Sequence, residues 1–261
     1  MCESSSECLR TNNRKNNKLN IPMFKKQERE KMKKTVLILM TAILAISLTA
    51  NESELWDKAK QFTKNGDDLV SGKVINTSIA KNKKGEETMH SVITIDLVQE
   101  AEGISTSFVS GTRNGKEVDE GDPEAEQYLM QDYTPEEGSF FDDVVSFQQT
   151  AEEKVIDDKE CIKFDYTAER TRLEKKKEIE VSETGTLWIE KSTGKPVFRE
   201  FVSDPLPKQI KEMNMQITYT SFEDAVIASR VETELLISVL LMKMRMTTIM
   251  EFSEFWRYEA E

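Results

Sequence analysis

The sequence contains very few of the residues that build metal sites, disulfides and catalytic triads. Its 261 residues include one histidine, His90, and three cysteines, of which only Cys161 follows residue 50. A zinc site needs several such ligands, and a serine triad is usually marked by a nucleophile elbow, Gly-x-Ser-x-Gly, which is missing. Carboxylates are so abundant that no catalytic pair can be singled out. We therefore predict no catalysis, no metal, no cofactor and no internal disulfide after residue 50.

Positive charge is scarce in most of the chain. Residues 1–50 hold 10 of the 36 Lys and Arg and 4 of the 48 Asp and Glu, so residues 51–261 keep 26 and 44, a net charge of about −18. Binding to nucleic-acid phosphates requires a basic surface, and this composition makes an acidic one. The sequence therefore predicts that nucleic acid is not a partner.

Long apolar runs are missing except at residues 33–50, KKTVLILMTAILAISLTA. Two lysines, an uncharged run and a final alanine are typical of a signal peptide, and the run is shorter than the roughly 20 residues of a membrane-spanning helix. We predict a polar upstream segment over 1–31, a signal peptide over 32–50 that is cleaved near Ala50, and one domain over 51–261. The product would be exported, soluble and periplasmic. An uncleaved anchor and a cytosolic N-terminal tail are the alternatives.

Alternation of apolar and polar residues dominates the rest of the chain after one short helix. Residues 53–64, SELWDKAKQFTK, place Leu55, Ala59 and Phe62 at helical spacing. Alternation then predicts strands over 92–98, 104–109, 159–166, 178–189, 213–219 and 233–255, separated by turn clusters. Short connections of this kind join antiparallel neighbours. We predict a mainly β domain, either a large curved antiparallel sheet or an incomplete β-barrel, with a few short helices.

Three local features stand apart from this pattern. Residues 116–138 are strongly acidic. The segment EAEQYLMQ within them is long enough for two helical turns, in which Tyr128 and Leu129 would pack as a lid. An acidic solvated loop is the favoured interpretation. Cys161 alternates with polar neighbours, which predicts a half-exposed thiol. His90 is expected to be an ordinary strand residue rather than a ligand.

Methionine is concentrated in two of the predicted strands. In LLMKMRMTTIMEFSEFW, residues 240–256, methionines alternate with charged and hydroxyl residues, and residues 213–219 repeat this alternation. Methionine specifies the shape of a core poorly but suits surfaces that accept varied apolar ligands, although an ordinary packed core is the alternative. We expect a hydrophobic ligand-binding cavity lined by Met213, Met215, Ile217, Tyr219, Met242, Met244, Met246, Met250, Phe252, Leu187 and Ile189, with Ile93, Ile95, Leu97, Ile179 and Val181 beside them.

Roughly the last 80 residues resemble a known family. The segment GTLWIEKSTGKPVFREFVSDPLPKQIKEMNMQITYTSFED, residues 185–224, has a strand with Trp and Ile before a turn and a Gly-Lys-Pro hairpin that returns as an extended strand. Long strands follow and close with TTIMEFSEFWRYE. This order is similar to the C-terminal half of LolA-like proteins, a superfamily that includes periplasmic carriers of outer-membrane lipoproteins. The resemblance implies an incomplete β-barrel, capped by helices, with a hydrophobic cavity that takes acyl chains.

These observations together predict a non-enzymatic binder. We expect an exported monomer that binds a lipid acyl chain or a lipidated protein and exchanges it with a membrane-associated delivery partner. The competing interpretation is a structural or interaction module, in which the same apolar faces pack on one another and a strand edge recruits a partner. An open apolar cavity distinguishes the first interpretation, and a dry packed core the second.

Overall fold

The computed structural model describes residues 54–100, 103–130, 140–174, 177–239 and 242–259, without the side chains of 173, 174, 239 and 242. The chain divides into two compact units, Met1–Asn51 and Glu52–Glu261. The predicted upstream segment and signal peptide therefore lie outside the described residues. Within these residues, no helix has the length and apolar character needed to cross a membrane.

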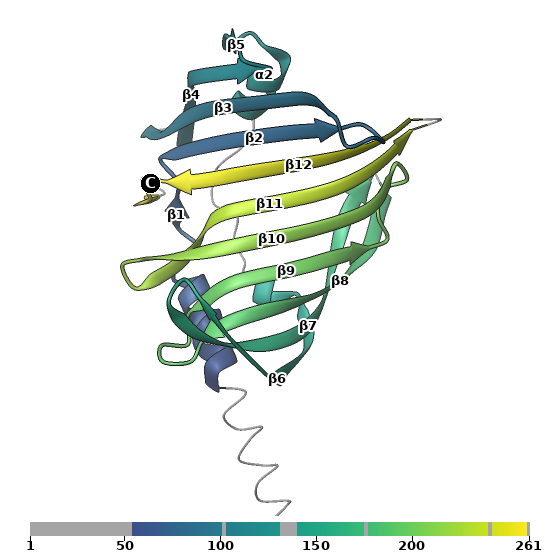
Figure 1. Cartoon of the computed structure of the whole chain (residues 1–261). Coiled ribbons are helices and arrows are strands. Elements are labelled where there is room, and N and C mark those ends of the chain that lie inside the picture. The colour runs from purple at the N-terminus through teal and green to yellow at the C-terminus, as the bar shows by residue number, and fades with distance from the viewer. Residues whose placement is uncertain (1–53, 101–102, 131–139, 175–176, 240–241, 260–261) are drawn as a thin grey trace, which may run out of the picture. The chain divides into compact units, whose positions relative to one another are not determined.

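One large antiparallel sheet of 11 strands dominates the second unit (Figure 1). In spatial order its strands are β5 (Lys116–Val118), β4 (Gly103–Arg113), β3 (Glu87–Glu100), β2 (Lys73–Lys81), β12 (Met242–Ser253), β11 (Ala225–Val239), β10 (Ile210–Phe222), β9 (Pro196–Asp204), β8 (Lys177–Glu190), β7 (Lys159–Glu174) and β6 (Val144–Ile156). A separate pair, β1 (Leu69–Val70) and β13 (Trp256–Arg257), joins the start and the end of the domain.

Within the large sheet, all pairs of adjacent strands except one are consecutive in the sequence. The exception is β2 with β12, whose register runs from Ser253↔Lys73 to Arg245↔Lys81 and joins the two halves of the sheet. The edge strands β5 and β6 do not pair with each other, so the described sheet is open. The predicted fold class, a large antiparallel sheet with few short helices, is confirmed.

The predicted strand over 233–255 is in fact two strands. Its residues belong to β11 and β12, which pair with each other through Leu235↔Met246 and Ile237↔Met244. The sequence between them, Leu240–Leu241, contains no glycine, proline, asparagine or aspartate that would indicate a turn. The alternation of apolar residues continues across the hairpin, which is why the pattern reads as one strand.

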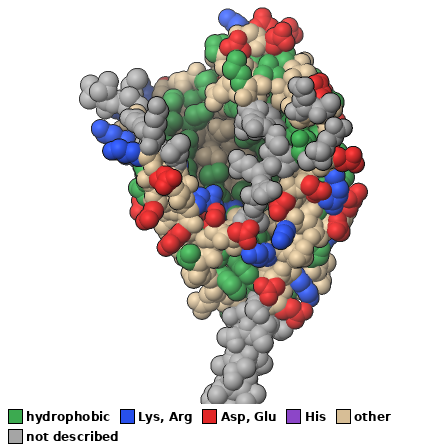
Figure 2. Space-filling model, turned by 180° about the vertical axis from the view of Figure 1, so that it is seen from behind, with side chains coloured by type: hydrophobic (Ala, Val, Ile, Leu, Met, Phe, Trp, Pro, Cys, Tyr) green, Lys and Arg blue, Asp and Glu red, His purple; other side chains and the backbone are tan. Residues whose placement is uncertain are grey.

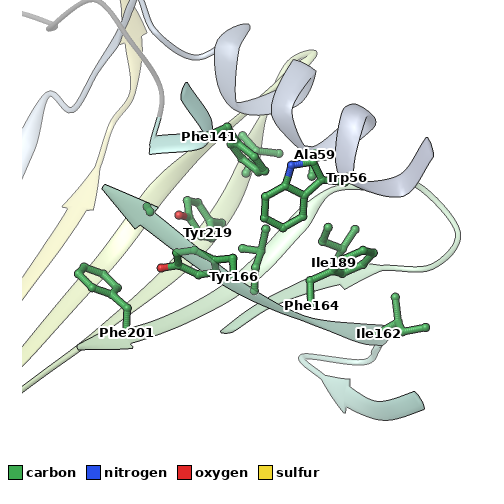
Figure 3. Close-up of a cluster of buried hydrophobic side chains, with 12 residues drawn as sticks. Trp56, Ala59, Phe141, Ile162, Phe164, Tyr166, Ile189, Phe201 and Tyr219 are labelled. Carbon is green, nitrogen blue, oxygen red and sulfur yellow. The ribbon is translucent and has the colours of Figure 1, made fainter. Parts of the chain in front are cut away.

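A first core cluster lies beneath the helix over residues 54–64. Trp56 and Ala59 on this helix are 4% and 0% exposed, and Figure 3 shows Trp56 pointing toward Phe164 and Tyr166 of the sheet. The ring centroids of Trp56 and Phe164 lie 5.6 Å apart. This confirms the predicted helix, whose spacing of Leu55, Ala59 and Phe62 directs its apolar side toward the strands.

A second core cluster lies beneath a helix that the sequence analysis did not favour. Helix α2 (Pro123–Leu129) begins at Asp122, whose side chain accepts a hydrogen bond from the backbone N–H of Glu124. Its residue Ala125 is fully buried, and Tyr128 and Leu129 pack against the cluster that contains Ile93 and Ile95. The preference for a solvated loop was therefore wrong over Pro123–Leu129, because the apolar side of this helix covers β2 to β4. Residues 131–138 of the acidic stretch lie outside the description.

Both helices cover one and the same side of the sheet, which we call the inner face. The strand pairing places the side chains of Tyr166 on β7, Phe201 on β9, Met215 on β10 and Ile93 on β3 on this same side of the sheet. The opposite side, the outer face, carries a third cluster of Cys161, Trp188 and Val197. Cys161 is 0% exposed, so its prediction as a half-exposed thiol was wrong: the side chain of Trp188 covers it.

We expect the Cys161 thiol to react slowly in the native protein. Burial raises the pKa of this thiol, and a buried, protonated sulfur is a poor nucleophile. Alkylation of the Cys161 peptide by iodoacetamide, followed by mass spectrometry, should be about 100-fold slower without denaturant than in urea, because the reaction requires opening of the native structure. Reducing agent should leave the Tm unchanged. Rapid native alkylation would show that this part of the sheet is open.

Candidate functional site

The strands β10, β11, β12 and β2 bring most of the predicted cavity residues onto the inner face. Side chains paired across neighbouring strands share a face, so the register arranges them in rows. The rows are Met213–Leu235–Met246–Ala80, Met215–Thr233–Thr248–Ser78 and Ile217–Val231–Met250–Asn76, with the pair Ile237–Met244 beyond the first. Two methionine-rich segments that are far apart in sequence therefore face the same space.

The predicted cavity residues divide into an open group and a buried group. Met213, Met215, Ile217, Met244, Met246, Met250 and Phe252 are only partly buried. Leu187 and Ile189 are 0% exposed and Tyr219 is 7% exposed, all in the first core cluster. The second group is therefore packed core rather than open wall. Met242 begins β12, but its side chain lies outside the description.

The inner face contains a hollow between the two helix-covered clusters. Figure 2 shows hydrophobic side chains gathered along this hollow when the protein is viewed from the side of the helices. The partly buried methionines of β10 and β12 belong to the strands between the two clusters, where neither cluster encloses them completely. In the middle row of the inner face, three side chains that carry hydroxyl groups lie side by side: Thr233, Thr248 and Ser78. This geometry suits a long apolar ligand with few polar contacts along its length.

A buried charged network lies on the inner face within the first core cluster. Glu183 on β8 and Arg199 on β9 are 1% and 4% exposed, and the Arg199 guanidinium donates hydrogen bonds to Glu183 and, over 2.7 Å, to the Tyr166 hydroxyl. Tyr166 in turn donates to Glu183 over 2.6 Å, and Arg170 donates to the other oxygen of Glu183 over 2.8 Å. Gly185 lies beside this group, and a Cβ there would meet the Tyr166 hydroxyl oxygen at 2.8 Å.

The surroundings of this network favour the charged form of Arg199. Burial by itself lowers the pKa of the guanidinium, but Tyr219, Tyr166 and Glu183 outweigh this and raise the pKa above its ordinary value. Burial also raises the pKa of the Tyr166 hydroxyl far above its ordinary value, so it remains a donor at all physiological pH values. The guanidinium carbon lies 3.8 Å from the ring centroid of Phe140 and 4.3 Å from that of Phe201, which adds cation–π contacts.

The sequence analysis missed this network, although one signal of it is present. In residues 179–189 every second side chain is apolar or glycine except Glu183, which shares its phase with Val181, Gly185 and Leu187. A single charge in the apolar phase of a strand predicts a buried ion pair. Its partner could not be inferred, because the pairing of Glu183 with Arg199 depends on the register of β8 and β9. The hydrogen bonds of the network join β7, β8 and β9, so it cross-links three strands of the sheet.

The described residues provide no group that could hold a metal ion. The His90 side chain is 46% exposed and lies 3.5 Å from a carboxylate oxygen of Glu87. His90 lies on β3, so its predicted position in a strand is confirmed. The inner face is therefore the best candidate for a functional site among the described residues.

The comparisons with known proteins assign neither a family nor a function. No family of known proteins matches the sequence, and no curated protein does. One similar solved structure is a DUF1329 family protein from Desulfovibrio piger ATCC 29098, with 11% identity, 80% of this chain and 93% of that chain covered, and a TM-score of 0.33. Another is the MucA/MucB complex of Pseudomonas aeruginosa, with 9% identity, 80% and 99% coverage and a TM-score of 0.22. Because these TM-scores are low, the LolA-like resemblance remains a prediction from the sequence. The observed fold of the described residues is a large open antiparallel sheet with two short helices.

Proposed function

We propose that the protein is an exported, non-enzymatic binder of lipid acyl chains, and that the chain lies along the inner face between the two core clusters. This proposal rests on one observation, which is that the methionine side chains of the inner-face rows are only partly buried. Met213 and Met215 on β10 and Met244 and Met246 on β12 flank β11, face one side and remain only partly buried. A packed core would enclose them.

The chemistry of these rows suits hydrocarbon. Thioether side chains are flexible and polarizable, so they adapt to chains of different length and unsaturation. Burial of about ten methylenes contributes roughly 8 kcal/mol, at about 0.8 kcal/mol per methylene, before the cost of association. That free energy supports micromolar binding without a polar anchor. A lipidated protein would present the same chain, and a membrane-associated partner would supply or remove it.

A second candidate function is strand addition at the edge of the sheet. β6 is the edge strand next to β7, and its side chains Val145 and Val155 are 58% and 63% exposed. An edge strand with exposed apolar side chains is a template for an extended peptide. This candidate needs no cavity, so it predicts that the protein binds a peptide whether or not lipid is present.

We expect lipid to accompany the protein through purification. Native mass spectrometry of protein isolated from its own cells under mild conditions should show added masses that correspond to acyl-bearing molecules. After delipidation, isothermal titration calorimetry with lysophosphatidylcholine should give saturable binding near one chain per protein. If the purified protein carries no lipid and the delipidated protein binds none, the acyl-chain proposal fails and strand addition becomes the better explanation.

A further inference from the structure

Lysines gather at one end of the sheet, near the β2–β3 and β9–β10 connections, the end of β11 and the start of β12. The pairs Ile210↔Ile237, Ile237↔Met244 and Arg245↔Lys81 place these strand ends on the same side of the sheet. In Figure 1 this is the end at the right, where the β2–β3 turn approaches the start of β12. Seven of the cations at this end are Lys81, Lys83, Lys84, Lys208, Lys211, Lys243 and Arg245, and we call these seven the cationic end.

The ion pairing of the cationic end differs from that of several other cations on the sheet. Elsewhere on the sheet, cations such as Lys73, Arg113 and Arg257 form ion pairs with one or more carboxylates. No member of the cationic end forms an ion pair with a described residue. The side chains are also exposed, so each is free to meet a ligand.

Carboxylates lie in two turns at the opposite end of the sheet. Asp157 and Asp158 lie in the β6–β7 turn, and Glu223 and Asp224 lie in the β10–β11 turn. The lysines of the β8–β9 turn are already engaged, for example Lys191 with Glu153 at 2.9 Å.

A pocket lies at the cationic end, where the two faces of β12 meet: Met244 belongs to the inner face, whereas Lys243 and Arg245 belong to the outer face. Beyond the pair Arg245↔Lys81 the two strands separate, and a pocket of about 540 Å³ opens between residues 82–85 and residues 243–245, with Leu236. Its volume falls in the range of small-molecule sites. Met244 lines this pocket and also faces Ile237 at the end of the inner-face rows. Lys83, Lys84 and Lys243 surround the same space.

We propose that the ligand is an anionic amphiphile, whose phosphate or carboxylate headgroup binds at the cationic end while its acyl chain lies on the inner face. This inference rests on the proposed function and specifies its ligand class. Ammonium groups on flexible stems suit a headgroup whose exact position varies with chain length. The protein's net negative charge repels anions elsewhere, so the cationic end fixes the direction in which the amphiphile enters.

The test compares two lysophospholipids with the same acyl chain by isothermal titration calorimetry below their micellar concentrations. Lysophosphatidylglycerol carries a net negative charge, and lysophosphatidylcholine carries none. The purified protein should bind the anionic lipid about tenfold more tightly at low ionic strength, because several exposed cations each contribute a modest, salt-screened attraction. The triple variant Lys83→Gln/Lys84→Gln/Lys243→Gln should bind both lipids equally. The matched control, Lys64→Gln/Lys154→Gln/Lys159→Gln, removes three lysines without ion pairs at the other end and should keep the preference.

The outcomes separate this inference from the proposed function. Equal affinity of the wild-type protein for the two lipids, or an unchanged preference in the triple variant, overturns the headgroup assignment and leaves acyl-chain binding intact. Failure of both lipids to bind overturns acyl-chain binding itself. Glycerol 3-phosphate serves as the headgroup without a chain. If it binds as tightly as the anionic lipid, the site takes a free anion and the amphiphile assignment is wrong.

Discussion

The substitution Glu183→Leu is expected to destabilise the domain by about 3–5 kcal/mol, because it leaves a buried guanidinium without its carboxylate. Arg199 is 4% exposed; it would keep the Tyr166 hydroxyl and the rings of Phe140 and Phe201 as close partners but would lose the carboxylate that balances its charge. Leucine fills most of the volume of glutamate, so loss of charge rather than a cavity dominates the effect. Urea unfolding with linear extrapolation measures the change.

A double variant tests whether the uncompensated charge is the cause. Glu183→Leu/Arg199→Met removes both charges and should recover most of the lost stability, since buried ion pairs replaced by apolar side chains of similar size are often neutral. The control Arg230→Leu breaks an exposed pair with Glu251, with Arg230 38% exposed, and should cost less than about 1 kcal/mol. A double variant that is no more stable than Glu183→Leu would contradict this account of the network.

The double substitution Met244→Glu/Met246→Glu is expected to abolish acyl-chain binding while the domain stays folded. Two carboxylates would lie where hydrocarbon must bind, and burial of an unpaired charge is strongly unfavourable. In the free protein both positions are partly exposed, so the carboxylates remain hydrated and the fold loses much less free energy than a core substitution would cause. Titration with lysophosphatidylcholine measures the chain contribution without a net headgroup charge, and thermal unfolding measures stability.

Two further variants give this experiment its controls. Val155→Glu/Val202→Glu adds the same charge at side chains that are 63% and 46% exposed, and it should leave binding and stability nearly unchanged. Leu187→Glu places a carboxylate at a position that is 0% exposed and should unfold the domain. If the methionine variant unfolds as Leu187→Glu does, the methionine rows are packed core and the acyl-chain proposal is wrong.

The sequence alone determined the class of the fold, the helix over residues 54–64 and the face on which the methionines lie. These follow from local periodicity, because a strand repeats every two residues and a helix every 3.6, and each segment contains its own period. Met213 and Met215, or Met244 and Met246, share a face whatever their neighbours are. The same local reasoning failed at Leu240–Leu241, where no turn residue marks the hairpin, and at Cys161, where the exposure depends on Trp188 from another strand.

Only the tertiary structure decided which of these faces meet and which remain open. The pairing of β2 with β12 joins the two ends of the domain, and no local pattern specifies it. The same pairing brings the lysines of the β2–β3 turn beside Lys243 and forms the pocket next to Met244. Likewise, whether a methionine lines a hollow or a core depends on where helices 54–64 and α2 lie on the sheet. Long-range register and helix placement arise from the summed packing of the whole domain, so they are absent from the periodicity of any one segment.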